Sequence, residues 1–188
     1  EYVKVCFKDF GDKVNYWATI NEPNYETLCC YGFGNYPPNV KNLERRWKAM
    51  YHLMLASARA IKAYRNMGFK GMIGLVSDSY PIEILKDNEG YREAKRLADI
   101  FFNTSVNDTC IKGYYPDEYV SHLTKLGYDL SYMLEEDKEV FQEGTVDYLG
   151  VNAYCRFLVK PCSGGETKME ANNTGASSNN EEMEIKDW

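Results

Sequence analysis

The chain has 188 residues, of which 44% are hydrophobic, so it can bury one sizeable core and is predicted to form a single domain. Its net charge of −6 and pI of about 5.1 argue against a nucleic-acid-binding surface. Because no run of about 18 apolar residues occurs, no membrane-spanning helix is expected. Neither end resembles a targeting segment, but the chain opens in mid-pattern at Glu1, so an upstream signal would not be seen.

The cysteine pattern favours reduced thiols in a cytoplasmic protein. The six cysteines form no C-x-x-C pair and no zinc spacing, and the adjacent Cys29 and Cys30 suit a disulfide framework poorly. Three N-x-[ST] triplets begin at Asn103, Asn107 and Asn172, and they matter only if the protein is secreted.

The first elements lead to an acidic residue at a strand end. Residues 1–10 read as the end of a helix that stops near Gly11, and Val14–Ile20 reads as a buried strand. Asn21-Glu22-Pro23 ends this strand, because proline cannot donate a ladder hydrogen bond. In parallel α/β proteins catalytic groups collect at such ends. The alternative is an ordinary strand-terminal glutamate that faces solvent.

An irregular loop is expected over residues 24–42, followed by the clearest helix of the chain. Tyr31, Phe33 and Tyr36 on this loop either stack on a sugar or only hold the loop in place. Asn42 is predicted to cap a helix that runs to Met67, with an apolar stripe that forms core. His52 lies on or near that stripe, and we expect a packed core histidine there, not a ligand or a base.

The remaining pattern alternates helices and strands, which predicts a parallel sheet with right-handed crossovers. Three adjacent strands should therefore place Glu22, Asp78 and Asn152 at one common end. The further elements expected are a second strand at Gly71–Ser77, a helix from Asp87 or Asn88, a short helix after Pro116, a solvated helical turn at Glu135–Phe141 and a third strand at Val146–Val151. A flexible loop is expected at about 162–180, and residues 181–188 are too short to assign.

The string W-x-T-x-N-E-P at Trp17–Pro23 resembles the acid/base signature of glycoside hydrolase family 1, the retaining β-glycosidases. The likeness extends through the whole chain and includes H-L-M-L-A-S-A-R-A-I-K from His52, K-G-Y-Y-P from Lys112 and V-D-Y-L-G-V-N-A-Y from Val146. The resemblance implies a (β/α)8 TIM barrel of the α/β class. Residues 1–188 would then be one partial barrel domain that covers strands four to six.

The resemblance also implies roles for four residues. Glu22 would be the catalytic acid/base, Asn21 would contact the sugar 2-hydroxyl, Asn152 would support the site, and Tyr154 would hydrogen-bond the nucleophile. The implied substrate is a β-glucoside or its 6-phosphate. F-F-N at Phe101–Asn103 and E-G-T-V-D-Y-L-G from Glu143 resemble bacterial 6-phospho-β-glucosidases. No metal or organic cofactor is expected, because two carboxyl groups perform the chemistry; the oligomeric state is open.

The family nucleophile is missing from the sequence. It is a glutamate in an (I/V)-T-E-N-G string, whereas the nearest match here, Asp87-Asn88-Glu89-Gly90, precedes a helix. The first three strands of the family pattern are also absent. We therefore expect a segment truncated at both ends and inactive alone, with Asp78 as the single in-chain substitute for the second carboxylate. The rival interpretation is a non-catalytic sugar-binding or purely structural partial barrel, which a downstream T-E-N-G string would exclude.

Overall fold

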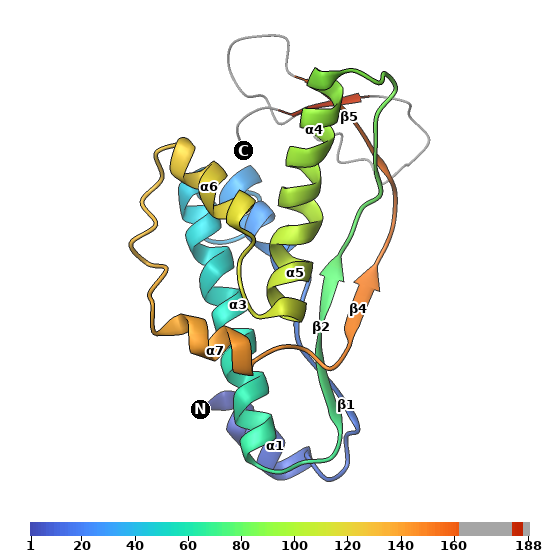
Figure 1. Ribbon diagram of the computed structural model, residues 1–188. Coiled ribbons are helices and arrows are strands. Elements are labelled where there is room, and N and C mark those ends of the chain that lie inside the picture. The colour runs from blue at the N-terminus through green and yellow to red at the C-terminus, as the bar shows by residue number, and fades with distance from the viewer. Residues whose placement is uncertain (162–181, 186–188) are drawn as a thin grey trace.

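A computed structural model describes residues 1–161 and 182–185. The loop expected at 162–180 lies outside the described residues. Figure 1 shows the strands along one side of the molecule and the longer helices along the other. No helix in the described part of the chain is long and apolar enough to cross a membrane.

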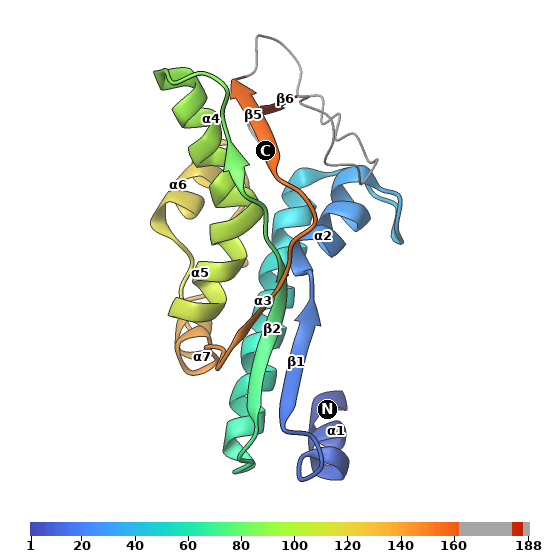
Figure 2. The ribbon, with the colours of Figure 1, turned by 90° about the vertical axis from the view of Figure 1, so that its right-hand side faces the viewer.

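The main sheet has three parallel strands in the order β1-β2-β4. β1 spans Tyr16–Asn21, β2 spans Met72–Asp78 and β4 spans Leu149–Asn152. Tyr16 pairs with Met72 at the start of β1, and Leu75 pairs with Leu149 at the start of β4. The prediction of three adjacent parallel strands is confirmed. Their carboxyl ends, which point upward in Figure 2, carry the polar residues of interest.

A second parallel sheet, which the sequence did not predict, lies beyond these carboxyl ends. It contains β3 (Ile82–Glu83), β5 (Phe157–Pro161) and β6 (Glu182–Ile185), in the order β3-β5-β6. The short β3 leaves almost no periodic pattern to detect, because two residues cannot show an alternation. The ring of Phe157 stacks on that of Tyr80 with centroids 4.3 Å apart, which packs the start of β5 against the segment between β2 and β3.

Helices cover one face of the main sheet, and the largest core cluster forms between α3 and the helices that follow β2. Asn42 caps α3 as predicted, since its Oδ1 accepts a hydrogen bond from the Arg45 backbone N–H at 2.8 Å. The helical elements are α1 (Tyr2–Phe10), α2 (Pro23–Thr27), the π-helix η1 (Leu28–Phe33), α3 (Leu43–Asn66), α4 (Glu89–Asp99), the π-helix η2 (Ile100–Thr104), α5 (Ser105–Lys112), α6 (Asp117–Lys125) and α7 (Asp137–Glu143).

The expected burial of the first strand is wrong. None of the six residues of β1 is fully buried, and Tyr16 is 69% exposed. β2, in contrast, lies between two strands and buries most of its residues. β1 pairs on one side only and has no layer over its second face within the described residues. Met72 and Val151 are exposed on the same sheet.

Residues 24–42 are not one irregular loop. Pro23 starts α2, since its missing N–H is not needed at a first helical position, and Tyr31 and Phe33 lie on η1. Gly34 then ends η1 in the left-handed conformation with φ of 66°. Gly34 thus marks a helix end, whereas Pro37 and Pro38 lie in the connection between η1 and α3.

Two further expectations need correction. His52 is not packed in the core: it is exposed, and its Nδ1 lies 2.7 Å from the Lys48 carbonyl oxygen. It follows Tyr51 by one residue, about 100° around the helix, so it falls beside the buried stripe. The helical turn at α7 is not simply solvated, because Asp137 and Phe141 are buried. Asp137 accepts hydrogen bonds from Tyr51 Oη at 3.0 Å and from Arg59 at 3.2 Å, both on α3.

Candidate active site

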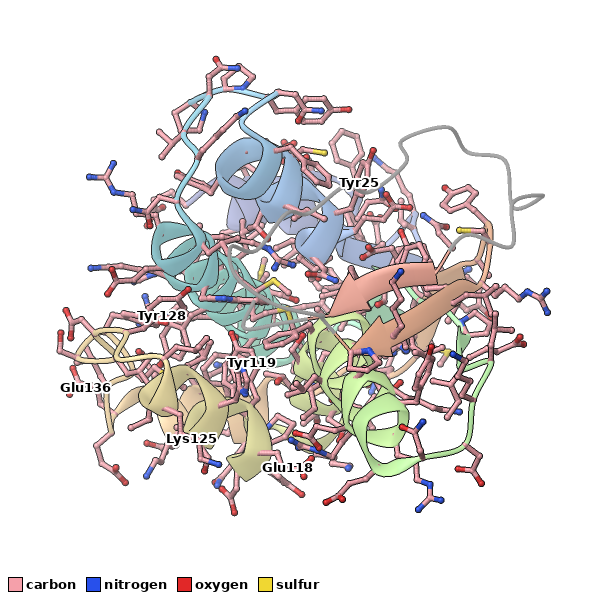
Figure 3. All side chains as sticks on the ribbon, turned by 90° about the horizontal axis from the view of Figure 1, so that it is seen from above. Tyr25, Glu118, Tyr119, Lys125, Tyr128 and Glu136 are labelled. Carbon is pink, nitrogen blue, oxygen red and sulfur yellow. The ribbon has the colours of Figure 1, made fainter. Side chains whose placement is uncertain are left out.

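The carboxyl ends of β1, β2 and β4 gather the polar residues that the sequence singled out. Asn21 ends β1, Asp78 ends β2 and Asn152 ends β4, while Glu22 directly follows β1. Parallel strands bring such ends together at one edge of a sheet, so the predicted common end is confirmed. Figure 3 looks down on this end, where Tyr25 of α2 is labelled.

Donors from the end of β4 converge on one oxygen of Glu22. The Asn152 side-chain amide donates to Glu22 Oε1 at 2.6 Å and to Asn21 Oδ1 at 3.2 Å. The Tyr154 hydroxyl donates to the same Oε1 at 3.2 Å. Tyr154 is 70% exposed, and the charge of Glu22 raises the pKa of its hydroxyl, which keeps the hydroxyl protonated as a donor. Thus all four residues assigned by resemblance meet at one point.

A bulge in β1 aims Glu22 at this point. Ala18 pairs with Gly74 and Asn21 pairs with Val76, so three steps along β1 face two along β2. The Thr19 hydroxyl lies in the bulge, donates to the Gly74 carbonyl at 3.0 Å and lies 2.6 Å from Ser57 Oγ. These two contacts of its hydroxyl explain why a threonine is found two residues before Asn21-Glu22-Pro23.

The backbone of Glu22 is in the left-handed region, with φ of 49° and ψ of 56°. This conformation is uncommon for a residue with a side chain and persists where the surroundings hold it. The Glu22 N–H donates to the Val76 carbonyl at 2.8 Å, and the Glu22 carbonyl accepts from the Glu26 N–H at 2.9 Å. The turn is therefore fixed on both sides of the carboxylate.

Asp78 lies at the same end of the sheet but is sealed from solvent, with 1% of its surface exposed. Burial raises the pKa of its carboxyl to about 7, and the nearby charge of Glu22 acts in the same direction. Tyr80 and Arg46 oppose the shift by favouring the ionised form. Asp78 Oδ1 is buried with no hydrogen-bond partner in the described structure.

Sequence reasoning missed two buried polar residues beneath the site, Arg46 on α3 and Asn24 on α2. Arg46 Nη2 donates to Asn24 Oδ1, and both residues are almost entirely buried. A signal for Arg46 existed, because it precedes the buried Met50 by four residues and so shares the core-facing side of α3. For Asn24 no such signal exists, since its partner is distant in sequence.

Among the described residues, the cysteines make no hydrogen bond to the carboxyl group of Glu22, and no metal-binding cluster is found. Cys29 and Cys30 are free thiols on η1, and burial raises the pKa of both. Cys6, Cys110 and Cys155 are free thiols as well, and Cys162 lies outside the described residues. Among the residues whose structure is described, no three His, Cys, Asp or Glu side chains gather closely enough to hold a metal ion.

A sequence model of one family, described as glycosyl hydrolase family 1, matches residues 1–188. The chain belongs to glycosyl hydrolase family 1. It is 37% identical to the 6-phospho-beta-glucosidase GmuD of Bacillus subtilis over 153 residues. The matched segment covers 81% of the chain and 33% of that protein. It is 30% identical to a 6-phospho-beta-galactosidase of Clostridium acetobutylicum over an alignment of 210 residues. This alignment covers 100% of the chain and 43% of that protein.

Solved structures agree with this family assignment. A beta-glucosidase from Exiguobacterium marinum matches with a TM-score of 0.78 at 27% identity, over 86% of the chain and 37% of that structure. The family 1 beta-glucosidase from Thermotoga maritima matches with a TM-score of 0.75 at 29% identity, over 85% of the chain and 35% of that structure. Since these enzymes are TIM barrels, the glycosyl hydrolase chain has the structure of part of a barrel. It spans less than half the length of these relatives.

Proposed function

We propose that the chain is the acid/base segment of a retaining β-glycosidase and corresponds to strands four to six of its barrel. The observation that carries the proposal is the convergence of Asn152 and Tyr154 on Glu22 Oε1 at the carboxyl ends of three parallel strands. Enzymes of this fold place their catalytic groups at that end. Membership of glycosyl hydrolase family 1 supports the same reaction class.

In this mechanism Glu22 protonates the leaving-group oxygen while a second carboxylate, about 5 Å away, attacks the anomeric carbon. Asn152 and Tyr154 occupy Oε1, so the catalytic proton belongs on Oε2. Water then hydrolyses the glycosyl-enzyme, with Glu22 acting as the base. Asn21 contacts the sugar, and the exposed hydroxyl of Tyr154 is accessible to the second carboxylate. The two-carboxylate reaction needs no metal or organic cofactor.

Asp78 is a poor replacement for the missing nucleophile. A nucleophile must reach the anomeric carbon of a bound sugar, whereas Asp78 is 1% exposed and closed in by its neighbours. The chain alone should therefore not hydrolyse β-glucosides. The substrate we propose is a β-glucoside, and more specifically a 6-phospho-β-glycoside, because both relatives named above carry 6-phospho names.

The test requires a complete enzyme, by which we mean a protein that contains residues 1–188 together with a second catalytic carboxylate. Glu22→Gln preserves size and removes the proton donor. Turnover of substrates with poor leaving groups should fall by roughly 10²–10⁴-fold. A nitrophenyl glycoside should still form the glycosyl-enzyme in a burst, because its leaving group needs no proton, and azide should release it.

Glu26→Gln is the matched control, since Glu26 is exposed on α2 four residues further along. It should leave turnover of both substrates near the parent value. Equal losses on good and poor leaving groups in Glu22→Gln, without a burst or azide rescue, would contradict the proposal. A parent protein that binds sugar but hydrolyses neither substrate would instead favour the non-catalytic partial barrel.

A further inference from the structure

A fully buried arginine lies beneath the turn that carries Glu22. Arg46 of α3 is 0% exposed, and its Nη2 donates to Asn24 Oδ1. Its Nε and Nη1 are buried without a hydrogen-bond partner within the described part of the chain. Burial lowers the pKa of Arg46 to about 10, so the side chain remains a cation at neutral pH. A buried cation is costly and calls for an explanation.

The buried acid that interacts electrostatically with Arg46 is Asp78 at the end of β2. The two residues act on each other electrostatically, since Asp78 raises the pKa of Arg46 and Arg46 lowers that of Asp78. Tyr119 and Tyr128, both labelled in Figure 3, also lie within electrostatic range of Arg46. Asp78, when ionised, is therefore a buried group of opposite charge within electrostatic range of Arg46.

Asn24 connects this cation to the catalytic turn. It follows Glu22 by two residues, is 1% exposed, and its side-chain amide also contacts the Phe102 carbonyl of η2 at 3.5 Å. Asn24 is thus tied to α3 and η2 together. Because Pro23 between them has a fixed φ, the position of Asn24 strongly restricts the backbone of Glu22.

From this geometry we propose that Arg46 is a positioning residue, which holds Glu22 in its left-handed conformation through Asn24. Arg46 does not touch the substrate. Without its hydrogen bond, Asn24 is released from α3, the turn relaxes toward a more common conformation, and the carboxyl group moves away from Asn152 and Tyr154. The catalytic part of this inference rests on the proposed function of Glu22, whereas the conformational part does not.

The conformational part is tested by NMR, since the ¹³Cα and ¹³Cβ chemical shifts of Glu22 report its φ and ψ. Arg46→Met removes the charge and the donor, and the Glu22 shifts should leave their left-handed values. Arg45→Met is the matched control, because Arg45 is the exposed neighbour on the same helix. It should leave the Glu22 shifts unchanged. Unchanged Glu22 shifts in a folded Arg46→Met protein would overturn the proposal.

Arg46→Met leaves Asp78 without its counter-charge and can fail to fold, so two further variants keep the proposal falsifiable. Arg46→Met with Asp78→Asn removes both charges, and Asn24→Leu removes the acceptor while keeping the branched shape of the side chain. Both should fold and both should move the Glu22 shifts. If both fold with native Glu22 shifts, Arg46 has only a packing role.

The catalytic part is tested in the complete enzyme by comparing leaving groups. Arg46→Met with Asp78→Asn should lower kcat for poor leaving groups by about 10–100-fold, because a displacement of about 1 Å can have this effect. KM and glycosyl-enzyme formation from a nitrophenyl glycoside should change little. Adding Glu22→Gln should abolish the effect of the pair. Equal losses for both leaving groups would overturn the catalytic part, whereas no leaving-group effect of Glu22→Gln alone would refute the proposed function instead.

Discussion

Glu22 and Asp78 occupy equivalent places in the fold but have opposite surroundings. Each is a carboxylic acid at the carboxyl end of a parallel strand, on the neighbouring strands β1 and β2. Glu22 is only partly buried and receives two side-chain donors on one oxygen. Asp78 is sealed, has an oxygen with no partner in the described structure, and faces a buried cation. A position at a strand end therefore does not by itself make a catalytic acid.

The difference follows from where each acid lies relative to its strand. Glu22 lies one residue beyond β1, on the left-handed turn before α2, where it is only partly buried. β2 lies between β1 and β4, so the residue that ends it is enclosed by both neighbours and by the helices behind them. Glu22 therefore differs from Asp78 in two respects: it is more accessible, and side-chain donors orient its carboxyl group.

Removing the charge of Asp78 should produce the largest effect on stability. The pKa of its carboxyl rises from 3.8 to about 7 on folding, so its favourable contribution is present below pH 3.8 and is lost as pH rises through about 7. We expect Asp78→Asn to be more stable than the parent at pH 8 by up to about 4 kcal/mol. Urea unfolding of the complete enzyme measures this difference.

The same pair of proteins compared at pH 4 is the control, because Asp78 is then largely protonated in the folded parent. The advantage of the variant should be small there and grow toward pH 8. A stability difference that does not depend on pH would show that the ionisation of Asp78 is not its cause.

Removing the shorter donor to Glu22 should mainly affect catalysis. Asn152 donates to Oε1 at 2.6 Å, and a hydrogen bond to a charged group contributes about 1.5–3 kcal/mol. Asn152→Ala should therefore lower kcat/KM for poor leaving groups by about 10–100-fold. Steady-state kinetics of the complete enzyme provides the measurement. Asn35→Ala, at an exposed position after η1, is the control and should have little effect. Full activity in Asn152→Ala would show that Asn152 is not part of the active site.

The smallest effect is expected for Tyr154→Phe. Its hydroxyl lies 3.2 Å from Oε1 and the side chain is 70% exposed, so water can replace the lost donor. If the Tyr154 hydroxyl acts on Glu22 alone, we expect kcat/KM of Tyr154→Phe to fall by less than about tenfold. A much larger loss would indicate that Tyr154 acts mainly on the second carboxylate, as the family resemblance implied.

Patterns that are local in sequence predicted the frame of the site. The apolar runs before Asn21, Asp78 and Asn152 predicted strands, and the alternation with helices predicted parallel pairing, so the common end followed. The helical spacing from Met50 could have indicated that Arg46 is buried, but its pairing with Asn24 could not be predicted, because it joins elements far apart in the sequence. The exposure of His52 was missed for a different reason: it follows the buried Tyr51 by one residue, and one residue along a helix turns the side chain from the buried face toward solvent.

The open side of the sheet has a consequence for the chain in solution. Within the described residues β1 and β4 each pair on one side only, and Tyr16, Met72 and Val151 leave apolar surface uncovered. Such edges offer free backbone groups to any extended segment, including another copy of the same sheet. The 188-residue chain should therefore add strands from other molecules, bind hydrophobic dyes and sediment faster than a monomer. Separately supplied strands that complete a barrel should suppress this association.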